Sequence, residues 1–223
     1  MMLQRTGNKF IIYFFLIIIL GSINNYSLTK FINFKIKHIY ITGFEIDETL
    51  DLRNNIFNLN LKNIFFLDKK FLVEELNKNN LIENFYVYKN YPSTLKLVIK
   101  KTKFVAKIKK QNDIFLVGTN AKLVPLNNSN LELPFIYGEP KISEILYFLK
   151  IIENSNLKIE EVDSLYYFKS GRWDIKTKNN ILIKLPINDY LEKLKYLPLI
   201  IINKNFDQKI LDYRIQNQII TYD

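Results

Sequence analysis

The sequence of 223 residues contains no cysteine. That absence excludes thiolate catalysis and cysteine zinc sites, and it means that a fold outside the cytoplasm would need no disulfide. Glycine and proline are also scarce. Six of each are scattered along the chain, so the sequence has no long flexible or polyproline-like linker. No two glycines lie close enough together for a phosphate-binding loop or a dinucleotide fingerprint.

Histidine is nearly absent as well. A Ser-His-Asp triad would have to use His38, the one histidine, and a histidine-based metal site would lack a second ligand. The adjacent acids Glu74–Glu75 and Glu160–Glu161 are typical of solvated faces. A glycosidase-type carboxylate pair stays open, although no residue pattern favours it. The sequence therefore predicts no catalytic, metal-binding or cofactor-binding residues, no small-molecule substrate, and a protein that is not an enzyme.

Positive charge is plentiful, with a formal net charge of +10 from 32 basic and 22 acidic residues. The basic residues are spread along the chain and do not cluster beside stacking aromatics, so nucleic acid is not the expected partner. Attraction to anionic lipid headgroups fits this spread better.

One long apolar run stands near the amino terminus, from Phe10 to Leu20. Its extension to Leu28 gives 19 residues, and a helix of that length measures roughly 28 Å, near the thickness of a bilayer core. A cleaved signal peptide and a buried core helix are the alternatives. An uncleaved signal anchor fits best, because no small-residue cleavage site follows the run and it is apolar on every face. Arg5 and Lys9 then stay cytoplasmic, which predicts a single-pass type II protein with most of the chain outside.

The segment from 36 to 104 predicts the order strand, helix, helix, strand, strand. Residues 34–41 alternate as a strand does and end at Gly43, and the two later strands are residues 83–89 and 94–101. Apolar side chains at helical spacing mark the two helices between them. These helical positions are Leu50, Ile56, Phe57, Phe71, Leu72 and Leu76.

The segment from 105 to 223 predicts a β-rich domain with two packed helices. The first helix follows Pro140 and the second begins near Asp189. Strands are expected at 105–109, 114–117, 122–125, 162–168, 172–177, 181–185, 209–214 and 218–222. Trp173, the one tryptophan, is expected in the core. Arg172 and Arg214 stand out in a lysine-rich chain, and we expect structural ion pairs with Asp174 and Asp212.

Several motifs together resemble the FtsQ/DivIB family of cell division proteins. They are Ile39-Tyr-Ile-Thr-Gly43, the stretch from Leu81 through Tyr91-Pro92 to Leu97, Leu133-Pro134 through Gly138, Arg172-Trp173-Asp174-Ile175 with Ile181 to Leu185, and Ile210 to Arg214. They occur in the family's order and cover nearly the whole chain.

The resemblance implies an α+β fold: a transmembrane helix, a POTRA domain and an FtsQ-type β domain. The expected ranges are 1–9 for a cytoplasmic tail, 10–28 for the signal anchor, 29–35 for a linker, 36–104 for the POTRA domain and 105–223 for the β domain. It further implies a scaffold in the inner membrane at the division septum, with its bulk in the periplasm, that recruits and links FtsB and FtsL homologues. A POTRA-containing secretion or envelope assembly factor is the alternative, but such factors usually carry several POTRA repeats.

The family binds partners at its carboxyl-terminal edge, so strand addition is expected there, through backbone hydrogen bonds to an exposed strand. An open edge is normally a liability, and leaving one open is consistent with a binding role. The predicted partner-binding residues are Ile210, Leu211, Asp212, Tyr213, Arg214, Ile215, Gln218, Ile220 and Tyr222.

Overall fold

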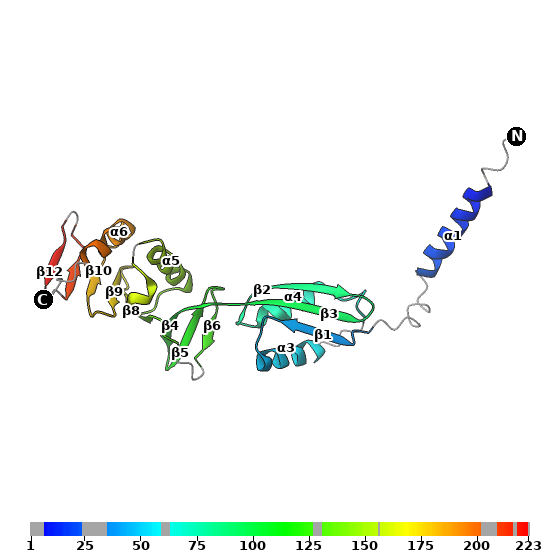
Figure 1. Ribbon diagram of the computed structural model, residues 1–223, viewed down its shortest axis with the longest axis horizontal. Coiled ribbons are helices and arrows are strands. Elements are labelled where there is room, and N and C mark those ends of the chain that lie inside the picture. Colours follow the sequence, from blue (N-terminus) through cyan, green and yellow to red (C-terminus); the bar gives the residue numbers. More distant parts are fainter. Residues whose placement is uncertain are drawn as a thin grey trace. The chain divides into compact units, whose positions relative to one another are not determined.

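Figure 1 shows a computed structural model of the chain. It describes residues 7–23, 35–58, 63–126, 131–155, 157–201, 209–215 and 218–222. The chain divides into two compact units. The first comprises residues up to 75 together with 85–99, and the second comprises 76–84 together with 100 onward. The domain boundary at residues 104 and 105 stays a prediction.

Helix α1 (Gly7–Ile23) contains the apolar run, and its side chains from Phe10 to Leu20 are all exposed. Among the residues that the structure describes, no helix reaches the combination of length and apolar character that crossing a bilayer requires. The predicted anchor, 10–28, continues into residues 24–28, which lie outside the described residues. The same holds for residues 1–6 of the predicted tail and 29–34 of the predicted linker.

The first unit has the predicted order of elements, which is confirmed. Parallel pairing joins β1 to β3, and the three-stranded sheet has the order β1-β3-β2. Leu95 and Leu97 alternate with exposed or half-buried residues along β3 and are fully buried, as a strand with one covered face requires. The elements are β1 (His38–Thr42), α3 (Ile46–Asn58), α4 (Lys69–Lys78), β2 (Ile82–Asn90) and β3 (Thr94–Lys101).

The buried faces of α3 and α4 are narrower than the sequence predicted. Leu52 and Ile56, four residues apart, share the covered face of α3. Phe57 and Phe71 were expected to be buried, but each is about half exposed. Leu50 is exposed to a similar degree, because only one stripe of a short surface helix can face a small sheet.

The second unit is built on a nine-stranded mixed sheet with the order β12-β11-β10-β9-β8-β7-β4-β5-β6. Its strands are β4 (Phe104–Lys110), β5 (Asp113–Gly118), β6 (Leu123–Pro125), β7 (Phe135–Tyr137), β8 (Val162–Tyr167), β9 (Trp173–Thr177), β10 (Leu182–Lys184), β11 (Ile210–Asp212) and β12 (Ile220–Tyr222). Its helices are α5 (Ile142–Glu153), the short 3-10 turn η1 (Ile159–Glu161) and α6 (Tyr190–Ile201). The expected strands and both helices are confirmed, and β7 and η1 are additional. The fold is therefore mixed α+β, with a large sheet and few helices.

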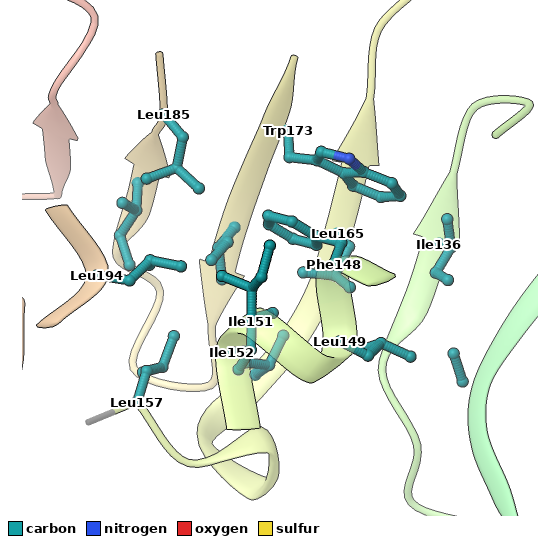
Figure 2. Packing of buried hydrophobic residues seen from close by; sticks show 14 of the residues in the cluster. Ile136, Phe148, Leu149, Ile151, Ile152, Leu157, Leu165, Trp173, Leu185 and Leu194 are labelled. Carbon is teal, nitrogen blue, oxygen red and sulfur yellow. The ribbon is translucent and has the colours of Figure 1, made fainter. Parts of the chain in front are cut away.

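The core of this unit lies between α5 and the sheet, as Figure 2 shows. Phe148 of α5 stacks on Trp173 of β9 with ring centroids 4.5 Å apart and planes at 6°. Trp173 is 3% exposed, which confirms its predicted place in the core. Ile145 and Ile152 on the same helix are also buried. Burial of these large apolar side chains holds α5 on one face of the sheet.

The second unit also includes a segment, residues 76–84, that the sequence assigned to the first domain. The turn after β5 holds it through Asn120, whose amide nitrogen donates to the backbone carbonyls of Asn80 (2.8 Å) and Ile82 (2.9 Å). In addition, the Asn80 side chain donates to the carbonyl of Leu123 (2.9 Å). The carbonyls of Asn80, Ile82 and Leu123 therefore accept hydrogen bonds from side chains.

Candidate partner-binding edge

The nine predicted partner-binding residues do not form one edge. Strand β11 pairs with β10 in parallel on one side and with β12 antiparallel on the other. Ile210, Leu211 and Asp212 therefore lie in an inner strand and offer no free strand edge, which corrects the expectation that β11 and β12 together form an open edge. Only β12 is terminal in the sheet.

The outward backbone groups of β12 can be assigned from its neighbours. Leu182 N–H donates to Lys209 C=O (2.8 Å), and Tyr213 N–H donates to Lys184 C=O (2.9 Å). The C=O of Lys209, the N–H of Tyr213 and both main-chain groups of Leu211 therefore point toward β10. The N–H of Lys209 instead donates to the C=O of Tyr222 on β12 (2.9 Å). Successive residues of a strand point these groups to opposite sides, so those of Ile210 and Asp212 face β12.

Ile210 lies opposite Tyr222, and Asp212 lies opposite Ile220. Ile220 and Tyr222 therefore turn their main-chain groups inward, to β11. Thr221, between them, points its N–H and C=O away from the sheet. Within the described residues no further strand pairs on that side. Tyr222 is 48% exposed, so an exposed aromatic lies beside the outward main-chain groups.

Two of the predicted binding residues belong to the core instead. Leu211 is fully buried and Tyr213 is 2% exposed, and both are part of the apolar cluster under the helices. The Tyr213 hydroxyl has no hydrogen-bond partner among the described residues. Burial raises the pKa of this hydroxyl. These side chains hold β11 in place and are not available to a partner.

The two predicted arginine ion pairs are confirmed. Arg214 donates from its Nε to both carboxylate oxygens of Asp212, at 2.8 and 3.0 Å, and its backbone N–H donates to the same group at 3.0 Å. Arg172 Nε donates to Asp174 at 3.2 Å, and its guanidinium lies 4.1 Å from the ring centre of Phe168. Such planar, multidentate contacts suit arginine better than lysine.

The two aspartates have opposite pKa shifts. The Arg214 side chain, through its hydrogen bonds, holds the pKa of Asp212 below its ordinary value, against the raising effect of burial. Burial raises the pKa of Asp174, and the charge and hydrogen bonds of Arg172 only partly offset it. Lys184 lies between the two, since it pairs with Asp174 on β9 and with Asp212 on β11. The face of the sheet beside the edge thus carries alternating charge.

Asp174, Lys184 and Asp212 belong to a longer row of side chains, one from each of six strands, on the face of the sheet opposite α5. Strand register places Tyr166 opposite Asp174 and Tyr137 opposite Tyr166. The two tyrosine rings stack at 5.0 Å and 11°. Sequence reasoning missed Tyr137, Tyr166 and Lys184, because only the register of β7, β8 and β10 brings them into one row with Asp212. In full the row is Tyr137, Tyr166, Asp174, Lys184, Asp212 and Ile220.

The remaining predicted residues flank the turn between β11 and β12. Arg214, Ile215 and Gln218 are exposed, and Gln218 N–H donates to Ile215 C=O at 3.4 Å. Residues 216 and 217 lie outside the described residues. No cluster of three or more histidine and carboxylate side chains that could hold a metal ion occurs in the described part of the chain.

Comparison with known proteins found a family and several similar sequences. The family model "Cell division protein FtsQ/DivIB, C-terminal" matches residues 106–215. The chain is 28% identical over 208 residues to the cell division protein FtsQ of Rickettsia conorii, covering 87% of this chain and 74% of that protein. It is 27% identical over 216 residues to FtsQ of Rickettsia bellii, with the same coverage.

A solved structure is also similar to part of the chain. It is the major extracytoplasmic domain of the trans isomer of the cell division protein DivIB from Geobacillus stearothermophilus, at 12% identity and a TM-score of 0.36, covering 45% of this chain and 91% of that one. Residues 106–215 thus match the carboxyl-terminal domain of the FtsQ/DivIB family of cell division proteins. Over 87% of its length the chain is similar to FtsQ proteins.

Proposed function

We propose that the chain is a non-catalytic scaffold of the division machinery that binds another polypeptide by adding its strand to β12. The outward N–H and C=O of Thr221 carry this proposal, because strand addition requires main-chain groups that the sheet has not used. The match of residues 106–215 to a cell division family and the similarity to FtsQ proteins support the setting. The partners we propose are FtsB and FtsL homologues, which the scaffold would recruit and link at the septum.

The face of β12 that carries Ile220 and Tyr222 supports a specific register for the added strand. An added strand would place alternate side chains beside Ile220 and Tyr222 on this face. Exposed Tyr222 would supply the apolar contact. Backbone bonds would thus give affinity, and this face would give register.

The first unit is proposed to be a POTRA domain, and α1 to be part of a membrane anchor. The order β1, α3, α4, β2, β3 on a three-stranded sheet supports the POTRA assignment. The exposed apolar run Phe10–Leu20, preceded by Arg5 and Lys9, supports a single-pass type II protein of the inner membrane with its bulk in the periplasm.

The absence of cysteine offers a clean topology test. A chain with Ser143→Cys should react with a membrane-impermeant maleimide in intact spheroplasts, because Ser143 is exposed on the second unit. A chain with Gln4→Cys should react only after lysis. Labelling of both variants, or of neither, before lysis would contradict the proposed orientation.

The binding proposal is tested with Thr221→Pro in the full chain. Proline removes the outward N–H and adds bulk on the side where the partner strand would lie, while Ile220 and Tyr222 keep their bonds to β11. Capture of FtsB and FtsL homologues should fall by about tenfold or more, as loss of at least one interface hydrogen bond plus a clash predicts. Thr221→Val is the matched control and should bind normally. Normal capture by a folded Thr221→Pro chain would refute strand addition at β12.

A further inference from the structure

A concave site lies in the second unit, far along the sheet from β12. It is a cleft of about 770 Å³ between the end of β4, the β6 strand and the segment that leads into α5. A volume of this order is typical of ligand-binding clefts. The strand order places β4 and β6 six and eight positions away from β12, so the cleft is distinct from the proposed partner edge.

The floor of the cleft is apolar. Ile108 is 8% exposed and Pro140 is buried, while Leu123 and Ile142 are half-buried. The half-buried Leu123 and Ile142 leave apolar surface open to the concavity, and such surface favours insertion of an apolar group from outside.

The rim is basic. Lys109, Lys110 and Lys141 line the cleft with one acid, Glu139. All four are exposed, and none of the three lysines forms an ion pair within the described chain. In contrast, Lys100 pairs with Glu83 at 2.8 Å and Lys178 with Glu132 at 3.4 Å. Three unpaired ammonium groups around one concavity create a positive potential that attracts carboxylates.

One backbone group at the amino terminus of α5 already has a partner within the chain. The Glu144 carboxylate accepts a hydrogen bond from Lys141 N–H at 2.7 Å. The lysine side chains supply the full positive charges that attract an anion here.

We propose that this cleft binds an acidic segment of a partner protein, which inserts an apolar side chain against Ile108 and Ile142 and pairs its carboxylates with the three lysines. A bilayer is a poor occupant, because a flat headgroup surface cannot reach the floor of a concave site. Strand addition is also unsuited to this end of the sheet. The edge strand β6 has only three residues, and the last of them is Pro125, which has no N–H to donate.

The test measures binding of a fluorescent peptide to the full chain in detergent. The probe is a hexapeptide with two central leucines flanked by glutamates, at low ionic strength. Replacing its glutamates by glutamine, or its leucines by serine, should each weaken binding, and raising the salt concentration should weaken it further. Equal binding of the glutamine peptide, or displacement of the acidic peptide by anionic vesicles, would overturn the proposal.

Variants of the chain locate the site. Lys141→Gln should weaken peptide binding about threefold and Lys109→Gln/Lys141→Gln about tenfold, as partly exposed ion pairs of roughly 0.5–1 kcal/mol predict. Lys150→Gln is the matched control, because Lys150 is an exposed lysine on the same helix outside the cleft. Ile142→Asp tests the floor and should abolish binding. Equal losses in Lys150→Gln and Lys141→Gln, or no binding of any peptide to the wild-type chain, would refute the site.

Discussion

Phe148 lies parallel to Trp173, with the two rings 4.5 Å apart, and this stack joins helix α5 to the middle of the large sheet. Phe148→Ala should lower the free energy of unfolding of the second unit by about 3–5 kcal/mol, the usual cost of a large aromatic deletion in a core. Urea unfolding followed by the fluorescence of Trp173, the one tryptophan, measures it directly. Tyr147→Ala, next on the helix but 63% exposed, should stay within about 0.5 kcal/mol of wild type.

Protonation of Asp212 at acidic pH should lower the stability of the second unit. Its folded-state pKa is lower than the ordinary 3.8, so the ionised carboxylate stabilises the fold above that pH, and this contribution is lost as pH falls through the lowered pKa. Asp212→Asn should therefore cost about 1 kcal/mol at neutral pH and almost nothing at strongly acidic pH, a modest figure because the Arg214 side chain is 44% exposed. Unfolding measured across pH checks this, and Arg214→Gln should behave alike. If the free energy of unfolding of both variants fell at acidic pH as it does in wild type, the Asp212–Arg214 pair would not be the cause.

Asp174 should give the opposite dependence of stability on pH. Burial raises its pKa, so its contribution is present at low pH and is lost as pH rises through the raised value. In Asp174→Asn that loss with rising pH should be absent. A steeper fall in stability with rising pH in this variant than in wild type would show that the sign is wrong.

The turn after β5 should be as important to the second unit as a core residue. Asn120→Ala removes the donors to Asn80 and Ile82 and leaves their carbonyls without this partner, so we expect a loss of about 1–3 kcal/mol in thermal or urea unfolding. Asn112→Ala, at an exposed turn position, is the control and should change little. A loss in Asn120→Ala no larger than in the control would show that residues 76–84 do not depend on this turn.

Two glycines with positive φ should differ in their tolerance of alanine. A Cβ at Gly138 (φ 102°) would overlap the backbone carbonyl oxygen of Tyr167, whereas a Cβ at Gly171 (φ 83°) would meet nothing within 4 Å. Gly171→Ala should cost only the backbone strain of about 1 kcal/mol, and Gly138→Ala clearly more, because β7 must move away from β8. Melting temperatures of the two variants compare them, and equal losses would contradict the packing of β7 on β8.

Sequence reasoning located most of the elements because strong local patterns mark them. The alternation along Leu95, Leu97 and Ile99 and the helical spacing in α5 depend on neighbouring residues alone, and both agree with the structure. The arginine ion pairs were predictable for a similar reason, because Asp174 and Asp212 each stand two residues from their arginine in the sequence.

The position of the open edge could not be predicted in this way. β11 pairs in parallel with β10, and that pairing joins segments more than twenty residues apart across α6, which no local pattern specifies. The assignment of residues 76–84 to the second unit depends likewise on a distant side chain, Asn120. Contacts between residues far apart in the sequence therefore determine both the position of the open edge and the unit to which residues 76–84 belong.

Hydrogen exchange at Thr221 tests the central claim most directly. In the free chain the Thr221 amide points away from β11 and should exchange quickly, whereas the amides of Ile220 and Tyr222 should be protected by their bonds to β11. On addition of the FtsB and FtsL homologues, the Thr221 amide should slow markedly while its neighbours change little. Partner binding that leaves exchange at Thr221 unchanged would show that strand addition at β12 is wrong.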